Sequence, residues 1–371
     1  MQLDGTSARI GLTASDSGSE DPAPTVMYVV SNATIPRARI AGIGTYLPET
    51  VVTSPDLEQS MREAGLSVAR GFIERMTGIA ARHVASRDEN ASDLAVAAAS
   101  KALEAAEMTA ADVDVLIFAA ASHDVTEPAT ANIVQVKLGA RRAAVFDVKN
   151  ACNSFLSAVD IADAFIRLGR ARAILIATGE VPSLVVDRGI RTRSELNERF
   201  SHLTMGDAGG AVVVVPTEDP ERGIRATAAT SDGAAWSLGT VLSYGSMYPH
   251  DTSPARAFLH TESCALEARA RTDMPSVMRA ALAAAGWSPG TVDVIACHQH
   301  TRKIAHELAV AIGMRPACVA LPLRYAGNAA AANIPLALAD ARREGALVPG
   351  ARVLLCGGSA GFSAMASAVT W

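Results

Sequence analysis

One pattern occurs twice in this chain, and it limits the possible folds more than any other feature of the sequence. Ala102-Leu103 precedes Val113-Asp114-Val115, and the pattern recurs 179 positions later as Ala281-Leu282 and Val292-Asp293-Val294. Each copy has an alanine-rich amphipathic segment, a polar turn and a β-branched apolar run, which is typical of a helix followed by a buried strand. A repeated α/β unit with apolar strands predicts buried sheets with helices on their faces.

Further matches follow in the same order and extend the repeat through most of the chain. Their offsets lie between 174 and 180 residues. We therefore expect two similar α/β halves in one body, an N-terminal half over residues 38–218 and a C-terminal half over 219–371, joined near 216–224. Residues 6–24 are rich in serine, glycine, proline and acidic residues, so residues 1–37 are expected to form a flexible N-terminal extension.

Composition excludes several kinds of function. The chain has 371 residues, of which 49% are hydrophobic, enough to bury a large core. Its 33 basic and 38 acidic residues include no basic block, so nucleic acid is not an expected partner. The five cysteines lack metal-ligand spacing, which predicts a reduced, cytoplasmic protein without a metal. The sequence also lacks a signal-like start and any uncharged apolar run of ~20 residues, so no membrane association is expected.

The repeat places two reactive residue types at corresponding turns. The apolar run Val145–Val148 leads to Cys152 and a helical pattern that ends at Leu168. In the second half, Val319–Leu323 is expected to form a strand that leads to Asn328 and a helix ending at Arg343. Backbone N–H groups and the positive end of a helix dipole converge at such turns. We therefore expect a lowered pKa for the Cys152 thiol.

Four features follow predicted strands, and each has a structural alternative. Cys152 alone is most simply a small buried apolar residue. His298 ends a predicted strand, where a neutral imidazole could polarise a thioester or move a proton, although a core histidine is the commoner case. Asn328 is a good helix N-cap and could also donate its amide to an enolate oxygen. The glycines around Ala360 require close backbone approach, either to another strand or to a ligand that the N–H groups of Ala360 and Cys152 would bind.

Taken in order, these segments resemble the thiolase superfamily, and within it the ketoacyl synthase III group that begins fatty-acid and aromatic polyketide chains. The resemblance spans about residues 38–371 and rests on four motifs: Asp147-Val148 with Ala151-Cys152, His298-Gln299, Gly327-Asn328 with Ala331-Ala332, and Gly361-Phe362-Ser363. It implies a thiolase-like α/β fold in which the two halves form a layered α-β-α-β-α body.

The resemblance also implies roles for individual residues. Cys152 would be the acylated nucleophile, and His298 and Asn328 would stabilise the enolate of the second thioester. The backbone N–H groups of Cys152 and Ala360 would form the oxyanion hole. No bound cofactor is implied, because the substrates are carried on coenzyme A or on the phosphopantetheine arm of an acyl carrier protein. Members of the group are homodimers whose acyl cavity is closed by a loop from the partner.

Two departures from the family pattern affect the expected substrates. Phe72 and Met76 stand where starter synthases have tryptophan and arginine against the coenzyme A nucleotide, and Lys303 replaces a second arginine. The aromatic face survives but a cation is lost, which favours a carrier-protein-bound donor. Phe72 and Lys303 remain the candidate pantetheine-binding residues.

The second departure is Glu127, which lies where starter synthases place an apolar residue of the partner loop. As a loop glutamate before a proline it is simply solvated. It also resembles the general base of the head-to-head condensing ketosynthases, in which case Glu127 of one subunit would deprotonate the second thioester in its partner.

Three functions are consistent with these residues. The first is Claisen condensation of acyl-Cys152 with a second thioester to give a β-ketoacyl product in fatty-acid or polyketide-type metabolism. The second passes the acyl group to an oxygen or nitrogen acceptor, with His298 as general base. The third is an inactive partner subunit of a heterodimeric ketosynthase, which the presence of Cys152, His298 and Asn328 disfavours.

Overall fold

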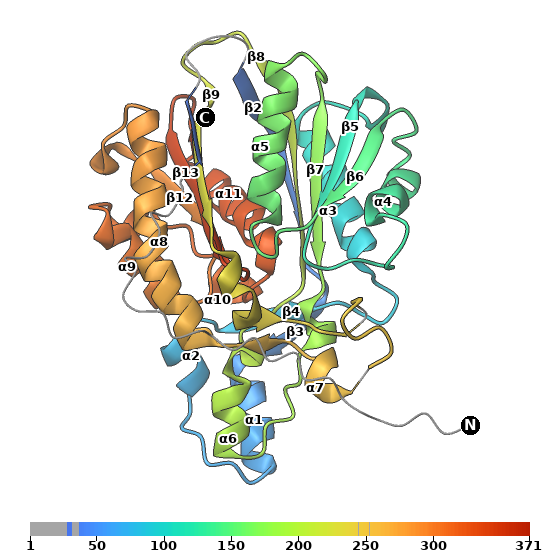
Figure 1. The fold of residues 1–371 in the computed structure, drawn as a ribbon, viewed down its shortest axis with the longest axis vertical. Coiled ribbons are helices and arrows are strands. Elements are labelled where there is room, and N and C mark those ends of the chain that lie inside the picture. The colour runs from blue at the N-terminus through green and yellow to red at the C-terminus, as the bar shows by residue number, and fades with distance from the viewer. Residues whose placement is uncertain (1–27, 32–36, 244, 252) are drawn as a thin grey trace, which may run out of the picture.

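The computed structural model describes residues 28–31, 37–243, 245–251 and 253–371, and two five-stranded sheets form its core (Figure 1). The first sheet has the order β2 (Arg37–Tyr46), β8 (Ala208–Thr217), β7 (Ile174–Glu180), β5 (Val115–Ala119) and β6 (Ala144–Val148). The second has the order β1 (Tyr28–Ser31), β9 (Gly223–Ser231), β14 (Ser363–Thr370), β13 (Arg352–Ser359) and β12 (Val294–Cys297).

The register of the two sheets reproduces the sequence repeat. In the first sheet, parallel strands β5 and β7 pair Val115 with Ile174. In the second, parallel strands β12 and β13 pair Val294 with Val353, which lie 179 positions further on. The predicted α/β class and the duplicated architecture are therefore confirmed.

Helices cover both outer faces and fill the space between the sheets. The strands of the first sheet pack against α3 (Ala91–Ala105) and α4 (Thr130–Leu138), and the second sheet packs against α8 (Ser263–Ala284), with α9 (Arg302–Ala311) alongside. The middle layer is α5 (Ser154–Arg167) and α11 (Asn333–Arg343), and its apolar residues join the largest core cluster. Burial of these amphipathic helices on both faces explains why the turns at their N-termini have fixed positions.

A smaller lobe lies at one end of the molecule (Figure 1). It contains the hairpin of β3 (Thr50–Thr53) and β4 (Ala81–Val84) and the helices α1 (Ser54–Glu63), α2 (Phe72–Thr77) and α6 (Arg193–Glu198). The nearby pair β10 (Gly239–Thr240) and β11 (His260–Thr261) is accompanied by α7 (Pro254–Ala257). Apolar side chains of α1, α2 and α6 share one cluster, so the lobe has its own small core.

The strand predicted over Val319–Leu323 is wrong. Only Val319 forms a bridge, to Ile295 in β12, and the chain then enters α10 (Leu323–Ala326). Pro322 has φ of −60° and no N–H to donate, so it ends the extended segment and begins the helix. The second sheet thus has one bridge where the first sheet has β6.

Residues 28–31, inside the segment expected to be flexible, form strand β1. Their backbone pairs antiparallel with β9, so that Tyr28 lies opposite Ala229. The serine- and proline-rich stretch over 6–24 lies outside the described residues. In the described part of the chain, no helix has the length and apolarity needed to cross a membrane.

Candidate active site

Cys152 lies in the turn between β6 and α5. Its predecessor Ala151 has φ of 45°, a left-handed conformation that costs a non-glycine residue about 1 kcal/mol. The Ser154 hydroxyl fixes the turn, because it accepts from Asn150 N at 2.8 Å and donates to Ala151 O at 2.7 Å. Helix α5 begins at Ser154, so the partly exposed Cys152 precedes the helix N-terminus.

The second half contains the same turn, as the repeat predicts. Ala330 also has φ of 45°, and the Asn333 side chain accepts from Ala329 N at 2.8 Å at the start of α11. The matching positions are therefore Ala151 with Ala330 and Cys152 with Ala331. Asn328 lies in the corresponding turn, three residues before the counterpart of Cys152.

Asn328 is not a helix N-cap, because α11 begins five residues later and its cap position is Ala332. Its side chain is nearly fully buried, and its Oδ1 accepts from Ala330 N at 3.1 Å. Its backbone N–H donates to Thr204 O at 2.8 Å. These bonds fix the amide plane, and Nδ2 donates to no acceptor among the described residues, so it is free to donate to a bound oxygen.

His298 follows β12 directly. Its backbone N–H donates to Cys356 O at 2.9 Å, and its ring Nδ1 lies 3.2 Å from Ala330 O. A carbonyl oxygen only accepts, so this contact places the proton on Nδ1 and leaves the lone pair on Nε2. Burial, and next the neighbouring His300, lower the pKa of His298 to about 4. The imidazole is therefore neutral at pH 7, with a basic Nε2.

The structure brings the two turns and His298 together. The Ala330 carbonyl oxygen accepts from His298 Nδ1, and the Ala330 N–H donates to Asn328 Oδ1. On the other side, a side chain at Gly357 would lie 2.3 Å from Asn153 Oδ1 and 3.3 Å from His298 Cβ. His298 and the residue after Cys152 therefore both pack against the bare backbone of Gly357.

The expected lowering of the Cys152 pKa is wrong. Burial of the thiol, followed by the negative charge of Glu180, raises its pKa to about 12. Both effects disfavour the thiolate, and together they outweigh the helix dipole. Cys152 is consequently a neutral thiol at pH 7 and needs a base to react.

Ala360 lies in the hairpin that joins β13 to β14. The Asn153 side chain donates to Ser363 O at 3.1 Å and to Ser363 Oγ at 3.0 Å, which ties this hairpin to the cysteine turn. Within the described residues, neither Cys152 N nor Ala360 N donates to another residue's backbone carbonyl. Both N–H groups are therefore available to a bound oxygen.

Glu127 lies exposed on the loop between β5 and α4. None of the described contacts within the single chain joins it to Cys152, His298 or Asn328. The base of its loop is anchored, because Ala121 N and Ser122 N both donate to the buried Glu180 carboxylate.

The candidate pantetheine residues lie on neighbouring elements. Phe72 packs edge-on against Phe200 at a centroid distance of 6.0 Å, whereas Met76 is 55% exposed. The end of α2 lies against the start of α9, since a side chain at Gly78 would be 2.6 Å from Arg302 Cβ. Lys303 follows Arg302 and is largely exposed, with Glu307 3.7 Å from its Nζ.

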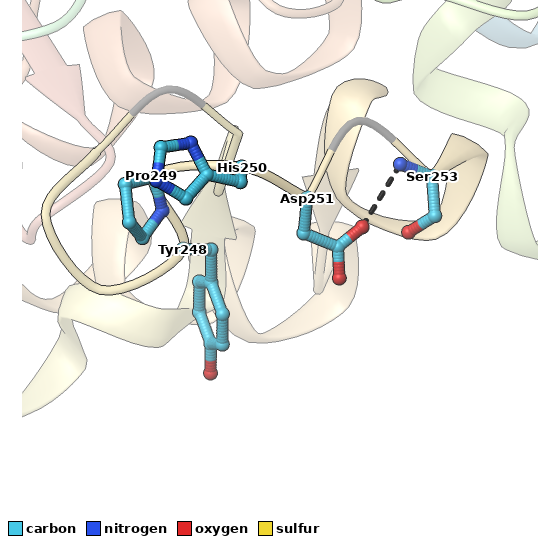
Figure 2. A pocket seen from close by; sticks show the side chains of 5 residues that line it. All are labelled: Tyr248, Pro249, His250, Asp251 and Ser253. Carbon is cyan, nitrogen blue, oxygen red and sulfur yellow. Dashed lines mark hydrogen bonds between the residues drawn. The ribbon is translucent and has the colours of Figure 1, made fainter. Parts of the chain in front are cut away.

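A shallow hollow elsewhere on the surface is formed by Tyr248, Pro249, His250, Asp251 and Ser253 (Figure 2). Asp251 accepts from Ser253 N at 2.9 Å, and Arg256 stacks on Tyr248. The hollow contains none of the predicted site residues. In the described part of the chain, no three histidine, cysteine or acidic side chains gather as metal ligands.

Sequence reasoning missed Glu180. Glu180 ends the apolar run of β7 and is fully buried. The sequence did contain a signal for it, because Glu180 is a single acidic residue at the end of an otherwise apolar strand, and a buried carboxylate requires hydrogen-bond partners. Gly357 is one of the glycines near Ala360 for which the sequence predicts close backbone approach, and the structure shows Asn153 and His298 as the groups that pack against it.

Comparison with known proteins agrees with this geometry. The chain matches two family models, 3-oxoacyl-[acyl-carrier-protein] synthase III over residues 146–233 and its C-terminal domain over 282–371. It is 36% identical over 332 residues to β-ketoacyl-[acyl-carrier-protein] synthase III of Rhodospirillum rubrum, covering 88% of this chain and 97% of the relative. It is also 37% identical over 338 residues to β-ketoacyl-[acyl-carrier-protein] synthase III of Rhodospirillum centenum, and this match covers 90% of this chain and 99% of the relative.

Solved structures show the same likeness. FabH of Pseudomonas aeruginosa has a TM-score of 0.81 at 28% identity, covering 90% of this chain and 98% of that one. The priming β-ketosynthase of the R1128 polyketide pathway has a TM-score of 0.82 at 27% identity, covering 92% of this chain and 98% of that one. Cerulenin-bound OleA of Xanthomonas campestris has a TM-score of 0.79 at 25% identity, covering 91% of this chain and 98% of that one.

The fold, the contacts of His298 and Asn328 with Ala330 and these relatives define a condensing acyltransferase of the thiolase superfamily. Within that class, the chain belongs to the 3-oxoacyl-[acyl-carrier-protein] synthase III family.

Proposed function

We propose that Cys152 takes an acyl group from a thioester and that a second thioester then attacks it to form a β-ketoacyl product. The observation that carries this proposal is the arrangement around one turn. Asn328 presents a free amide NH₂, His298 presents a basic Nε2, and Ala330 holds both of them. A buried site with one base and one directed donor suits acyl transfer followed by enolate chemistry.

In the acylation step, His298 Nε2 takes the proton of Cys152. A base is required because the pKa of Cys152 is about 12, whereas Nε2 is unprotonated at pH 7. The sulfur attacks the thioester carbonyl, the N–H groups of Cys152 and Ala360 stabilise the oxyanion, and the donor's carbon–sulfur bond breaks. The departing thiolate recovers the proton from His298, which leaves acyl-Cys152.

In the condensation step, Asn328 Nδ2 donates to the enolate oxygen of the second thioester. Glu127 from a second copy of the chain takes the α-proton. The enolate carbon then attacks acyl-Cys152, the new carbon–carbon bond forms, and the Cys152 carbon–sulfur bond breaks. The proton that Glu127 took returns to the Cys152 thiolate, which restores the neutral thiol. The exposure of Glu127 in the single chain agrees with a role that needs a partner.

The preferred donor is a thioester on an acyl carrier protein. The largely exposed Lys303 and the half-buried Phe72 would contact the phosphopantetheine arm. Met76 offers no charge to a nucleotide phosphate, which disfavours free coenzyme A thioesters. The active protein is a homodimer.

Intact-protein mass spectrometry with a panel of acyl thioesters tests the first step. Each acyl group is presented on coenzyme A and on a carrier protein, with Cys152→Ala as the control. We expect an adduct of the acyl mass that maps to Cys152 and forms faster from the carrier protein. A folded dimer that takes no adduct from any donor would instead support the inactive-partner hypothesis.

The neutral His298 also supports a second function, transfer from Cys152 to an oxygen or nitrogen acceptor. A basic Nε2 beside an acyl-enzyme would deprotonate an alcohol or amine as it attacks. Chromatography of the products separates the two functions. A β-ketoacyl product from two thioesters supports condensation, whereas an ester or amide formed only with an added acceptor supports the alternative.

A further inference from the structure

The duplicated fold contains a second turn built like the catalytic one. The shared register of β5–β7 and β12–β13, with the matching turns at Ala151 and Ala330, makes residues of these strands and turns counterparts at a separation of 179 positions. By this relation Ala331 is the counterpart of Cys152, and Val181 is the counterpart of Ala360. The N–H groups of Ala331 and Val181 therefore stand where the other half has its oxyanion hole.

This counterpart hole is filled by the chain itself. Ala331 N donates to Glu180 Oε1 at 3.3 Å, and Val181 N donates to Ser122 Oγ at 3.0 Å. The Ser122 hydroxyl in turn donates to Glu180 Oε2 at 2.8 Å. A carboxylate and a hydroxyl thus occupy the position that corresponds to the reacting oxygen in the catalytic site.

Glu180 also links two segments of the chain, because it accepts hydrogen bonds from both. Its side chain is fully buried and accepts two more bonds, from Ala121 N at 2.8 Å and Ser122 N at 3.1 Å. Ala121 and Ser122 begin the loop that carries Glu127, whereas Ala331 follows the residue that holds His298 and Asn328. Burial raises the pKa of Glu180, and the hydrogen bonds from these donors oppose that rise because they favour the ionised carboxylate.

We propose that Glu180 is a positioning residue, an internal anion that fills the repeat-related counterpart of the oxyanion hole and holds the Ala121–Ser122 loop base and the Ala329–Ala331 turn beside Cys152. Glu180 touches neither substrate nor the reacting atoms. This role rests on the proposed functions of Cys152, His298 and Asn328.

Chemical rescue tests the proposal. In Glu180→Ala, two backbone N–H groups of the loop and one of the turn lose their acceptor, and acylation of Cys152 should slow by about tenfold or more. Formate or acetate should enter the vacated hole, accept those bonds and recover much of the rate. Glu104→Ala, which removes an exposed acid on α3, is the matched control, and neither it nor the wild type should respond to either anion.

A second variant keeps the test independent of any acyl donor and of the folding of Glu180→Ala. Glu180→Gln retains the shape but removes the negative charge that helps to raise the pKa of Cys152. Its alkylation by iodoacetamide, followed by peptide mapping of Cys152, should therefore rise at lower pH than in the wild type. A residue with a purely structural role would leave this pH profile unchanged.

The proposal is overturned if folded Glu180→Ala acylates Cys152 at the wild-type rate. It is also overturned if the lost rate is recovered by neither anion while Glu180→Gln keeps the wild-type alkylation profile. Failure of the proposed function is distinct from both results, because it would appear as absent acylation in the wild-type protein while alkylation of Cys152 continued.

Discussion

At the scale of single residues, the site combines a protonated thiol, Cys152, with a neutral imidazole, His298. The pKa of Cys152 is raised to about 12 and that of His298 is lowered to about 4, so both groups are neutral over the whole physiological range. The sequence named Cys152 and His298 as candidate site residues but did not predict the raised pKa of Cys152. The helix dipole at Cys152 is visible in the pattern of elements, whereas the opposing charge of Glu180 comes from another strand and appears only after folding.

The neutral His298 should make stability depend on pH. Its folded pKa lies below the ordinary value of 6.5, so between pH 6.5 and 4 the unfolded chain binds a proton that the folded protein does not. Stability is therefore lost as the pH falls through this window, by on the order of 1 kcal/mol at pH 5 after allowance for partial exposure. Urea unfolding at pH 7 and pH 5 should show this loss, and His298→Asn should lose correspondingly less.

Two substitutions at Asn328 separate its two contacts. Asn328→Asp keeps an oxygen that accepts from Ala330 N but removes the NH₂ donor, so Cys152 should still be acylated while condensation falls about a hundredfold. Asn328→Ala also frees the Ala330 N–H and should impair both steps. Mass spectrometry of the acyl-enzyme and an assay of the β-ketoacyl product measure the two steps separately. Unimpaired condensation in Asn328→Asp would remove this residue from the mechanism.

At the scale of elements, close packing of helices on strands depends on missing side chains. Gly44 in β2 lies under α3, where an added Cβ would be 2.0 Å from Ala98 O. Gly44→Ala should therefore separate the two elements and lower the free energy of unfolding by roughly 1–3 kcal/mol. Gly233→Ala is the control, because a Cβ there meets nothing within 4 Å. Equal unfolding midpoints for the two variants would contradict this account.

The sequence predicted elements best where the two halves agree. The repeated patterns predicted the strand and helix order that the structure shows, because apolar periodicity follows directly from burial in the layers. The failures fall where the halves differ. Val319–Leu323 is predicted as the counterpart of β6, but Pro322 prevents the strand and the chain enters α10 instead.

At the scale of the whole molecule, the proposed nucleophile, base and amide donor belong to one chain, whereas the role proposed for Glu127 requires a second chain. Mixing inactive Cys152→Ala with inactive Glu127→Gln should therefore restore condensation. In a mixed dimer, the subunit that retains Cys152 receives Glu127 from the other. If exchange is random, roughly a quarter of all sites become complete, because half of the dimers are mixed and each has one intact site of two.

The control for this experiment is a mixture of Cys152→Ala with His298→Ala. Both residues act in the same subunit, so no mixed dimer contains a complete site and the mixture should stay inactive. Sedimentation of the purified protein should show the dimer independently. Full condensation by Glu127→Gln alone would contradict the role of Glu127 without affecting the acylation of Cys152.

The chain passes from one sheet to the other only once after β2, through the short connection over 218–222. Each piece on either side of that connection contains nearly a whole sheet, but Cys152 belongs to the first piece and His298 and Asn328 to the second. A protease cut there would leave two chemically incomplete fragments. Catalytic activity would then return only when the two fragments reassemble, so an activity assay would measure the docking of the two halves.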